Sequence, residues 1–225
     1  MLVLVLAVDT ATPTVLAALV ELGPDGIART RSRRRTDDAR AHAEVLTPQV
    51  LACLAELGKA PADLDAVVCG DGPGPYTGLR VGMATAAAFA DALGIEVHGV
   101  CSLDGIAAAA GVSEELLVVT DARRKEVYWA RYRDAERIAG PAVTRPADLD
   151  TGSATAVAGS ARHAALFGLP VLGPESPDPA ALVGVAAQDL LAGTPPRPLV
   201  PRYLRRPDAV ATSVRRPVTQ PATPQ

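Results

Sequence analysis

GDGPGPYTGLRVG, at residues 70–82, constrains the architecture most, because five glycines and two prolines stand there between two apolar runs. The run before it, residues 65–69 (DAVVC), predicts a short buried strand. The run after it predicts a helix over residues 77–93 that ends at Gly94, and then a strand over residues 95–100. A strand, a tight turn, a helix and a further strand are typical of α/β layers with parallel strand pairs.

Upstream of this segment the sequence predicts three strands, at residues 2–8, 15–20 and 27–35. Turn residues separate them, so we expect an antiparallel meander. Its third strand carries many arginines, as an exposed edge strand does. A helix over residues 38–57 follows, with Pro48 expected to kink or divide it.

Downstream, a second unit begins near residue 102 as the first one does, with a hairpin that turns at an aspartate. Its strands are predicted at residues 116–120 and 126–132, and a helix at residues 179–191. The predicted domains are a first lobe over residues 1–101, a second lobe over residues 102–193 and a tail over residues 194–225.

The tail is rich in proline and arginine, and its last dozen residues are expected to be disordered. Two interpretations of its positive charge stay open. It is either a basic arm that contacts RNA or an acidic partner, or a solvated chain end.

Composition narrows the class of protein. The chain has 225 residues, a formal net charge of −3 and 48% hydrophobic residues, which is typical of a globular protein without a general attraction to nucleic acid. Three cysteines without CxxC spacing fit a reducing compartment, and three separated histidines do not suggest a metal site. No targeting signal and no apolar run of about 20 residues is seen, so we expect a cytoplasmic protein with no membrane segment.

Two groups of residues are weak candidates for nucleotide binding. Gly72 and Gly74 stand in a loop before a helix, where backbone amides bind phosphate, although neither GxxxxGK[ST] nor GxGxxG is present. A tight turn with Thr77 as the helix cap is the alternative. Asp9, with Thr10 and Thr12, follows the first strand and fits either a metal-bound phosphate site or a hairpin turn; Asp121 has the same two interpretations.

Small residues recur every four positions along the second predicted helix, at Gly78, Gly82, Ala86 and Ala90. This spacing lets another element approach closely, either within the domain or from another subunit. His42, on the first predicted helix, is interpreted as a surface or interface residue.

Five stretches together resemble one known family, TsaB, also called YeaZ. They are LAVDTAT (6–12), AHAEVLTPQV (41–50), GDGPGPYTGLRVG (70–82), DARRKEVYWA (121–130) and PRYLR (201–205). The family supplies the dimerisation subunit of the bacterial complex that makes threonylcarbamoyladenosine in tRNA. The resemblance implies an actin/Hsp70/sugar-kinase-like fold of two ribonuclease-H-like lobes, the second one reduced.

The resemblance also implies a non-catalytic role. The expected partners are a TsaD-type catalytic subunit, a TsaE-type ATPase and, through the complex, tRNA; a homodimer is possible. No cofactor is expected on this chain, while ATP and a metal are expected on the catalytic partner. Subunits of the family pair through the two N-lobe helices, so the expected interface residues are His42, Leu46, Gly78, Arg80, Gly82, Ala86 and Ala90. A bulky residue at Gly82 is then expected to block pairing and leave a folded monomer.

One comparison separates this chain from the catalytic relative. That relative carries two metal-binding histidines four residues apart, and the matching positions here are Ser102 and Ile106. Isoleucine has no ligand atom, so the metal site is not expected. Three alternatives remain: an ATP-dependent kinase or transferase of the same fold, a metallopeptidase, and a homodimeric binding module.

Overall fold

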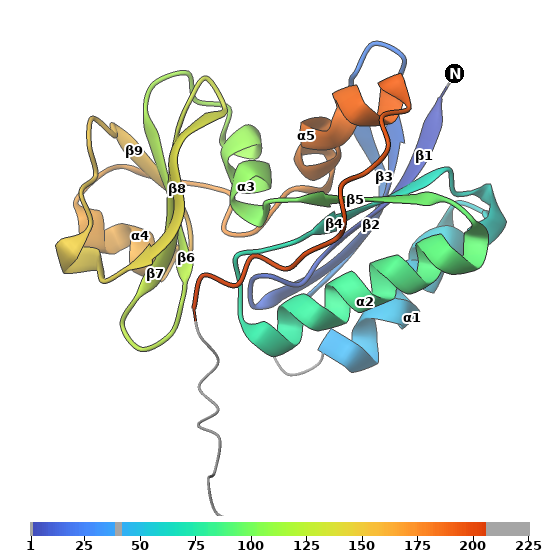
Figure 1. Ribbon diagram of the computed structural model, residues 1–225, viewed down its shortest axis with the longest axis horizontal. Helices are drawn as coiled ribbons and strands as arrows, with labels where there is room; N and C mark the ends of the chain where they lie inside the picture. Colours follow the sequence, from blue (N-terminus) through green and yellow to red (C-terminus); the bar gives the residue numbers. More distant parts are fainter. Residues whose placement is uncertain (1, 39–41, 206–225) are drawn as a thin grey trace, which may run out of the picture.

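The computed structural model describes residues 2–38 and 42–205 and contains two lobes, each built on a five-stranded sheet (Figure 1). In the first lobe the strand order is β3-β2-β1-β4-β5. The first three strands form the expected antiparallel meander, and β4 and β5 run parallel to β1. The strands are β1 (Val3–Asp9), β2 (Thr14–Leu22), β3 (Ala28–Asp37), β4 (Ala66–Gly70) and β5 (Glu96–Val100).

The second lobe repeats this topology, with the order β10-β9-β6-β7-β8. Its first three strands are antiparallel, β9 is parallel to β6, and β10 is parallel to β9. Two sheets with the same mixed order confirm the predicted α/β fold of two ribonuclease-H-like lobes. The strands are β6 (Leu116–Asp121), β7 (Val127–Arg133), β8 (Glu136–Thr144), β9 (Ala156–Gly159) and β10 (Val171–Leu172).

Helices cover both faces of each sheet. On the first sheet, α1 and α2 lie side by side on one face, and α5 lies on the other (Figure 1). On the second sheet, α3 packs on one face, and α4 with a short 3-10 turn packs on the other. The helices are α1 (His42–Glu56), α2 (Tyr76–Leu93), α3 (Ser102–Ala110), α4 (Ala161–Ala164) and α5 (Pro179–Ala192), and the 3-10 turns are η1 (Pro61–Asp63), η2 (Pro146–Asp148) and η3 (Ala165–Phe167).

Helix α2 begins at Tyr76, directly after the glycine-rich loop. It ends as expected at Gly94, whose φ of 66° lies in the left-handed region that glycine adopts easily. Helix α1 contains Pro48 but runs as one element from His42 to Glu56, so of the two expected effects of Pro48 a division of the helix is wrong, and a kink stays a prediction.

Helix α5 corrects the predicted domain boundaries. Its apolar residues Leu182 and Val183 pack against the first sheet, in one core with Val5 and Val20. The last helix of the chain therefore completes the first lobe. The prediction that residues 102–193 form one lobe fails at this helix, because sequence order does not determine which sheet an apolar helix covers.

The chain after α5 returns to the junction of the lobes. Residues 194–205 follow the first lobe, and Leu199 packs into its core. Arg202 and Arg205 bind groups of the same chain, which leaves these two arginines engaged within the protein. The rest of the predicted basic arm, residues 206–225, lies outside the described residues.

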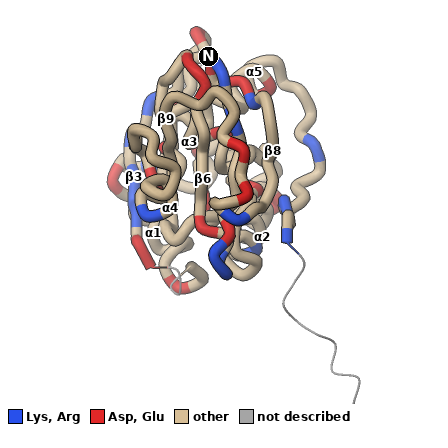
Figure 2. The backbone as a smooth tube through the Cα atoms, turned by 90° about the vertical axis from the view of Figure 1, so that its left-hand side faces the viewer, with Lys and Arg blue, Asp and Glu red and all other residues tan. Residues whose placement is uncertain are grey.

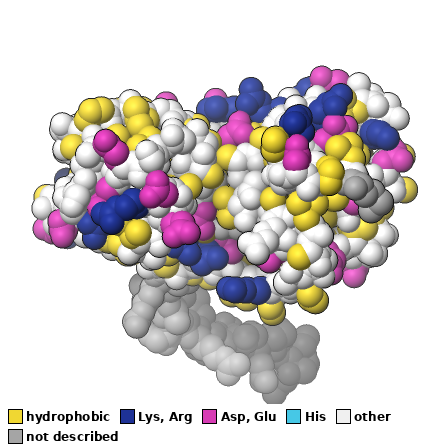
Figure 3. Space-filling model, turned by 90° about the horizontal axis from the view of Figure 1, so that it is seen from above, with side chains coloured by type: hydrophobic (Ala, Val, Ile, Leu, Met, Phe, Trp, Pro, Cys, Tyr) yellow, Lys and Arg dark blue, Asp and Glu magenta, His cyan; other side chains and the backbone are white. Residues whose placement is uncertain are grey.

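Charges of both signs are mixed along the chain rather than segregated (Figures 2 and 3). The arginines of the edge strand β3 illustrate this, because each of them lies beside a carboxylate. The pairs are Arg29–Asp25, Arg31–Glu21, Arg33–Asp178, Arg34–Glu56 and Arg35–Asp37. Among the described helices, none is long and apolar enough to cross a membrane.

Candidate functional site

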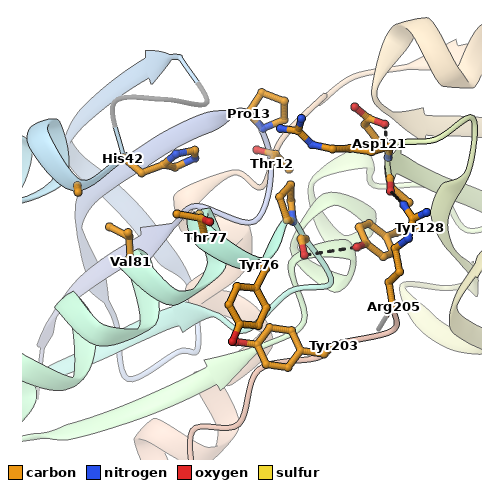
Figure 4. A pocket seen from close by; sticks show the side chains of 16 residues that line it. Thr12, Pro13, His42, Tyr76, Thr77, Val81, Asp121, Tyr128, Tyr203 and Arg205 are labelled. Carbon is orange, nitrogen blue, oxygen red and sulfur yellow. Dashed lines mark hydrogen bonds between the residues drawn. The ribbon is translucent and has the colours of Figure 1, made fainter. Parts of the chain in front are cut away.

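A cavity of about 590 Å³ opens between the two lobes (Figure 4). We call it the interlobe cavity. Its walls come from the β1–β2 turn of the first lobe, the β6–β7 turn of the second lobe, the first turns of α1 and α2, and the end of the described tail. Its side chains include Thr12, His42, Thr77, Val81, Asp121, Arg123, Tyr128, Tyr203 and Arg205.

The glycine-rich loop holds this region together by close packing. A Cβ atom on Gly74 would lie 2.3 Å from the carbonyl oxygen of Ala11 and 2.7 Å from its Cα, so only glycine fits there. From the second lobe, the Tyr128 hydroxyl donates a hydrogen bond to the Gly74 carbonyl. The loop therefore presses α2 against the first hairpin.

The loop residues differ in their access to the cavity. Gly74 lines it, whereas Gly72 is buried against Leu79 and does not. The predicted helix cap is wrong: α2 begins at Tyr76 after Pro75, with no side-chain cap, and Thr77 lies inside the first turn. The interpretation as a tight turn fits Gly72, and phosphate binding stays a prediction for Gly74.

Asp9 does not line the cavity. Its side chain accepts hydrogen bonds from the Ala11 amide at 2.9 Å and from the Ser102 hydroxyl at 2.5 Å, and the residue is 1% exposed. Burial raises the pKa of this carboxyl to about 6; the bonds from Ser102 and Ala11 oppose that rise, and nearby Asp71 adds to it. One oxygen thus stabilises the hairpin turn of the first lobe, and the other joins this turn to α3 at the junction of the lobes.

The two threonines after Asp9 have different positions. Thr10 donates a hydrogen bond to the Gly78 carbonyl at 2.7 Å and is buried. The Thr12 hydroxyl accepts a hydrogen bond from the Thr14 amide at 3.3 Å, as in a hairpin turn, and Thr12 also lines the cavity. On the second hairpin, Asp121 accepts the Arg123 amide at 2.7 Å, which likewise fits a turn.

His42 was expected to be a surface or interface residue; a position on the surface is wrong, and a role at an interface stays a prediction. The residue is 7% exposed, and its ring packs against the first turn of α2. Its Nε2 atom lies 3.1 Å from where a Cβ of Gly78 would be, and it has no hydrogen-bond partner among residues 2–38 and 42–205. The ring contributes a wall to the cavity (Figure 4).

The stripe of small residues on α2 faces inward. A Cβ on Gly82 would lie 2.2 Å from Thr10 Oγ1, so the element that approaches closely is the end of β1 in the same chain. Packing within the domain, one of the two interpretations of this spacing, therefore accounts for the stripe. The expectation that five residues of this region contact a partner directly is corrected, because they are buried and offer almost no surface. They are Leu46, Gly78, Gly82, Ala86 and Ala90.

Arg80 is the one residue of the expected interface that is exposed. Its guanidinium lies 4.0 Å from the centre of the Tyr76 ring, and its Nε donates a hydrogen bond to the Tyr203 hydroxyl at 2.6 Å. The rings of Tyr76 and Tyr203 stack with centres 4.9 Å apart. The sequence of the PRYLR segment does not indicate that it reaches α2.

A second stripe with the same spacing was missed. Ala84, Ala88 and Ala92 recur every four residues and lie on the exposed side of α2. The signal was present in the sequence, but two small-residue stripes on one helix cannot be assigned to core and surface without the tertiary structure.

Neither position of the expected histidine pair is free for a ligand. Ser102 binds Asp9, and Ile106 is fully buried in the core of the second lobe. Within the part of the chain that the structure describes, no three His, Cys, Asp or Glu side chains are grouped as they would be around a metal ion.

Comparison with known proteins places these features in a family. Residues 36–187 match the family described as TsaD: tRNA N6-adenosine threonylcarbamoyltransferase. The chain is 33% identical over 135 residues to the tRNA threonylcarbamoyladenosine biosynthesis protein TsaB of Escherichia coli (strain K12), which covers 59% of this chain and 56% of that protein.

The chain is also similar to uncharacterized mycobacterial proteins and to one solved structure of a YeaZ protein. An uncharacterized protein of Mycobacterium tuberculosis is 56% identical over 210 residues, 93% of this chain and 95% of that one. Another, from Mycobacterium leprae, is 58% identical over 207 residues, 92% of this chain, but this chain spans only 56% of its length. The structure of YeaZ from Pseudomonas aeruginosa superimposes with a TM-score of 0.73 at 26% identity, covering 90% of this chain and all of that one. The chain therefore belongs to the TsaB/YeaZ family.

Proposed function

We propose that this chain is a non-catalytic subunit that binds and activates a TsaD-type threonylcarbamoyltransferase, which modifies the tRNA adenosine next to the anticodon. The biosynthetic role of the TsaB relatives supports the assignment. In this proposal, binding energy biases the catalytic partner toward its competent conformation.

The observation that carries the proposal is the outer face of α1 and α2. A surface helix normally places charged residues toward solvent, yet the two helices carry only Glu44, Glu56, Arg80 and Asp91. Leu51 is 49% exposed near the middle of α1. We call six of the exposed uncharged residues of these helices the outer helix face: Ala43, Thr47, Leu51, Ala84, Ala88 and Ala92.

The outer helix face suits helices of a partner. Alanine side chains allow two helix backbones to approach closely, and Leu51 supplies an apolar anchor. The two helices lie side by side, so a partner that docks across both helices would bury about 800 Å² of this chain, a standard protein interface.

The chemistry is assigned to the partner. In this chain Asp9 is closed in by hydrogen bonds, and Ser102 and Ile106 occupy the positions at which the resemblance places metal ligands. We therefore propose that ATP and the metal bind the catalytic subunit, and that a TsaE-type ATPase and tRNA join through the complex.

The test is association with the TsaD-type subunit of the same organism, measured by gel filtration and calorimetry. Ala88→Arg places a charge in the centre of the outer helix face and is expected to weaken affinity by at least about tenfold. Val185→Arg, on the exposed side of α5 across the first sheet, is the matched control and is expected to bind normally. Equal binding by both variants would remove α2 from the interface.

The role in the cell needs a separate measurement. Cells that lack this chain are expected to lose threonylcarbamoyladenosine from their tRNA, and the Val185→Arg variant is expected to restore it where Ala88→Arg does not. A normal level of the modified nucleoside in the deletion strain would contradict the proposed function.

A further inference from the structure

The described end of the chain touches both lobes, at the mouth of the interlobe cavity. We propose that residues 199–205 form an interlobe clasp, which fixes the second lobe against α2 and holds the cavity at one width. In Figure 1 this segment descends from α5 past β5 to the junction of the lobes.

The clasp is anchored first on the first lobe. Leu199 packs in the core beside α2, and one of its methyl groups would lie 3.0 Å from a Cβ placed on Gly99. The Arg202 amide donates to the Asp71 carbonyl at 2.9 Å, and its Nε donates to the Asp71 carboxylate at 2.6 Å. Backbone and side chain thus hold the same residue.

Tyr203 gives the clasp a second grip on the first lobe. Its ring stacks on Tyr76, and its hydroxyl accepts the hydrogen bond from Arg80. Two aromatic rings and a guanidinium in contact restrict each other more than any one of them packed alone. This contact lies at the start of α2, where the cavity meets the helix.

Arg205 reaches the second lobe. Its Nη1 donates to the Ala122 carbonyl at 2.8 Å, and its Nη2 lies 3.3 Å from the Glu126 carboxylate. Both partners belong to the turn between β6 and β7, which forms the opposite wall of the cavity. Within four residues, from Arg202 to Arg205, the chain therefore joins the two walls.

The clasp adds to other contacts between the lobes, since α3 packs against α5 and the Ser102 hydroxyl binds Asp9, but it acts at the mouth of the cavity. The chain passes between the lobes at α3 and before α5, and the Tyr128–Gly74 hydrogen bond, at 3.4 Å, is long. A segment that fastens both walls with a 2.6 Å charged contact and a two-point arginine contact therefore restricts hinge motion of the lobes.

The experiment measures the distance between the lobes in the isolated full chain, so its outcome does not depend on the proposed partner. Spin labels are placed at Lys59→Cys and Glu136→Cys, which are exposed on the first and the second lobe. The native Cys53, Cys69 and Cys101 are buried, so labelling is selective. Pulsed electron resonance gives the distance distribution.

Arg205→Ala removes only the grip on the second lobe and is expected to roughly double the width of the distribution. Tyr203→Ala removes one of the grips on the first lobe and is expected to broaden the distribution less, because Leu199 and Arg202 still hold the clasp there. The matched control is Arg197→Ala, an exposed arginine two residues before the clasp for which no hydrogen bond or ion pair is seen within residues 2–38 and 42–205; it is expected to leave the distribution unchanged.

If Arg205→Ala is poorly folded, Glu126→Gln weakens the same grip from the second lobe, with a smaller broadening expected. Unchanged distributions in the folded Arg205, Tyr203 and Glu126 variants would overturn the clasp. Equal broadening by Arg197→Ala would overturn it as well.

Discussion

The Ser102 hydroxyl donates a hydrogen bond to the Asp9 carboxylate across 2.5 Å, and so joins the first residue of α3 to the last residue of β1. By the family resemblance, Ser102 stands where a catalytic relative carries a metal-binding histidine. In this chain the same position fastens one lobe to the other, and the acid that would serve a nucleotide site is its acceptor.

Replacement of Asp9 by Asn is expected to change how stability depends on pH. The pKa of Asp9 is raised to about 6 from 3.8, so the folded protein binds this proton more tightly than the unfolded chain. Its stabilising contribution is full below about pH 4 and is lost as the pH rises through about 6, a change of about 3 kcal/mol. An Asn side chain accepts the Ala11 amide and donates to Ser102 without titrating.

Urea unfolding of both proteins between pH 4 and pH 7.5 measures this. The free energy of unfolding of Asp9→Asn, relative to the parent protein, is expected to rise by about 2–2.5 kcal/mol over that range, because the unfolded-state carboxyl is already partly ionised at pH 4. A difference that stays constant with pH would show that Asp9 does not titrate in this window.

Gly82→Ala tests whether the inner stripe of α2 serves the chain's own core. Its Cβ would meet Thr10 Oγ1 at 2.2 Å, so we expect a loss of about 1–3 kcal/mol in the free energy of unfolding. Adding Thr10→Ala removes the clashing atom and is expected to recover part of that loss. The exposed substitution Ala88→Leu, on the other side of the same helix, is the control and is expected to change stability by less than about 0.5 kcal/mol.

Two glycine substitutions are expected to have opposite signs. Gly74→Ala pushes a methyl group into the backbone of Ala11 and is expected to destabilise the protein by about 3 kcal/mol or more. Gly184→Ala, in the exposed middle of α5 with open space around it, is expected to stabilise by about 0.5–1 kcal/mol. Thermal unfolding reports both, and a Gly74→Ala protein as stable as the parent would contradict the close packing of the loop.

Arg202→Ala is expected to leave a buried carboxylate without its counter-charge. The Asp71 side chain is 9% exposed, and burial raises its pKa whereas Arg202 lowers it. We expect a loss of about 1–3 kcal/mol in the free energy of unfolding near pH 7.5. Adding Asp71→Asn is expected to recover part of it, and equal stability of Arg202→Ala and Arg197→Ala would contradict the role of the pair.

The three cysteines are expected to resist thiol reagents in the native protein at pH 8. All three are buried, and burial raises the pKa of each thiol, that of Cys101 to about 12. Few thiolates are therefore present and none is accessible. Ellman's reagent is expected to detect three thiols only after denaturation; rapid reaction of one thiol in the folded protein would contradict this burial.

The sequence predicts most of the fold because its elements have strong local signals. Helix α2 was expected at residues 77–93 and occupies Tyr76–Leu93, and the strand expected at residues 116–120 is β6 (Leu116–Asp121). Strand β8 was missed, because its sequence ERIAGPAVT contains a Gly-Pro pair that is typical of a turn.

The site is predicted less well, because it depends on which surfaces meet. The spacing of Gly82 and Ala86 indicates that something approaches α2 closely, but not whether that is Thr10 of the same chain or another subunit. Likewise, nothing local in PRYLR indicates that Tyr203 contacts α2. Its hydrogen-bond partner Arg80 lies 123 residues earlier in the chain.

The position of α5 on the first sheet has a consequence for synthesis. A ribosome makes the chain from Val5 toward Leu182, and the apolar face that these residues share remains uncovered until the last helix emerges. The first lobe therefore cannot finish folding before the second has been translated, although its strands come first. A nascent chain released before Pro179 would expose this face to solvent and to chaperones. The N-terminal lobe therefore reaches its final fold only after α5 has been synthesised.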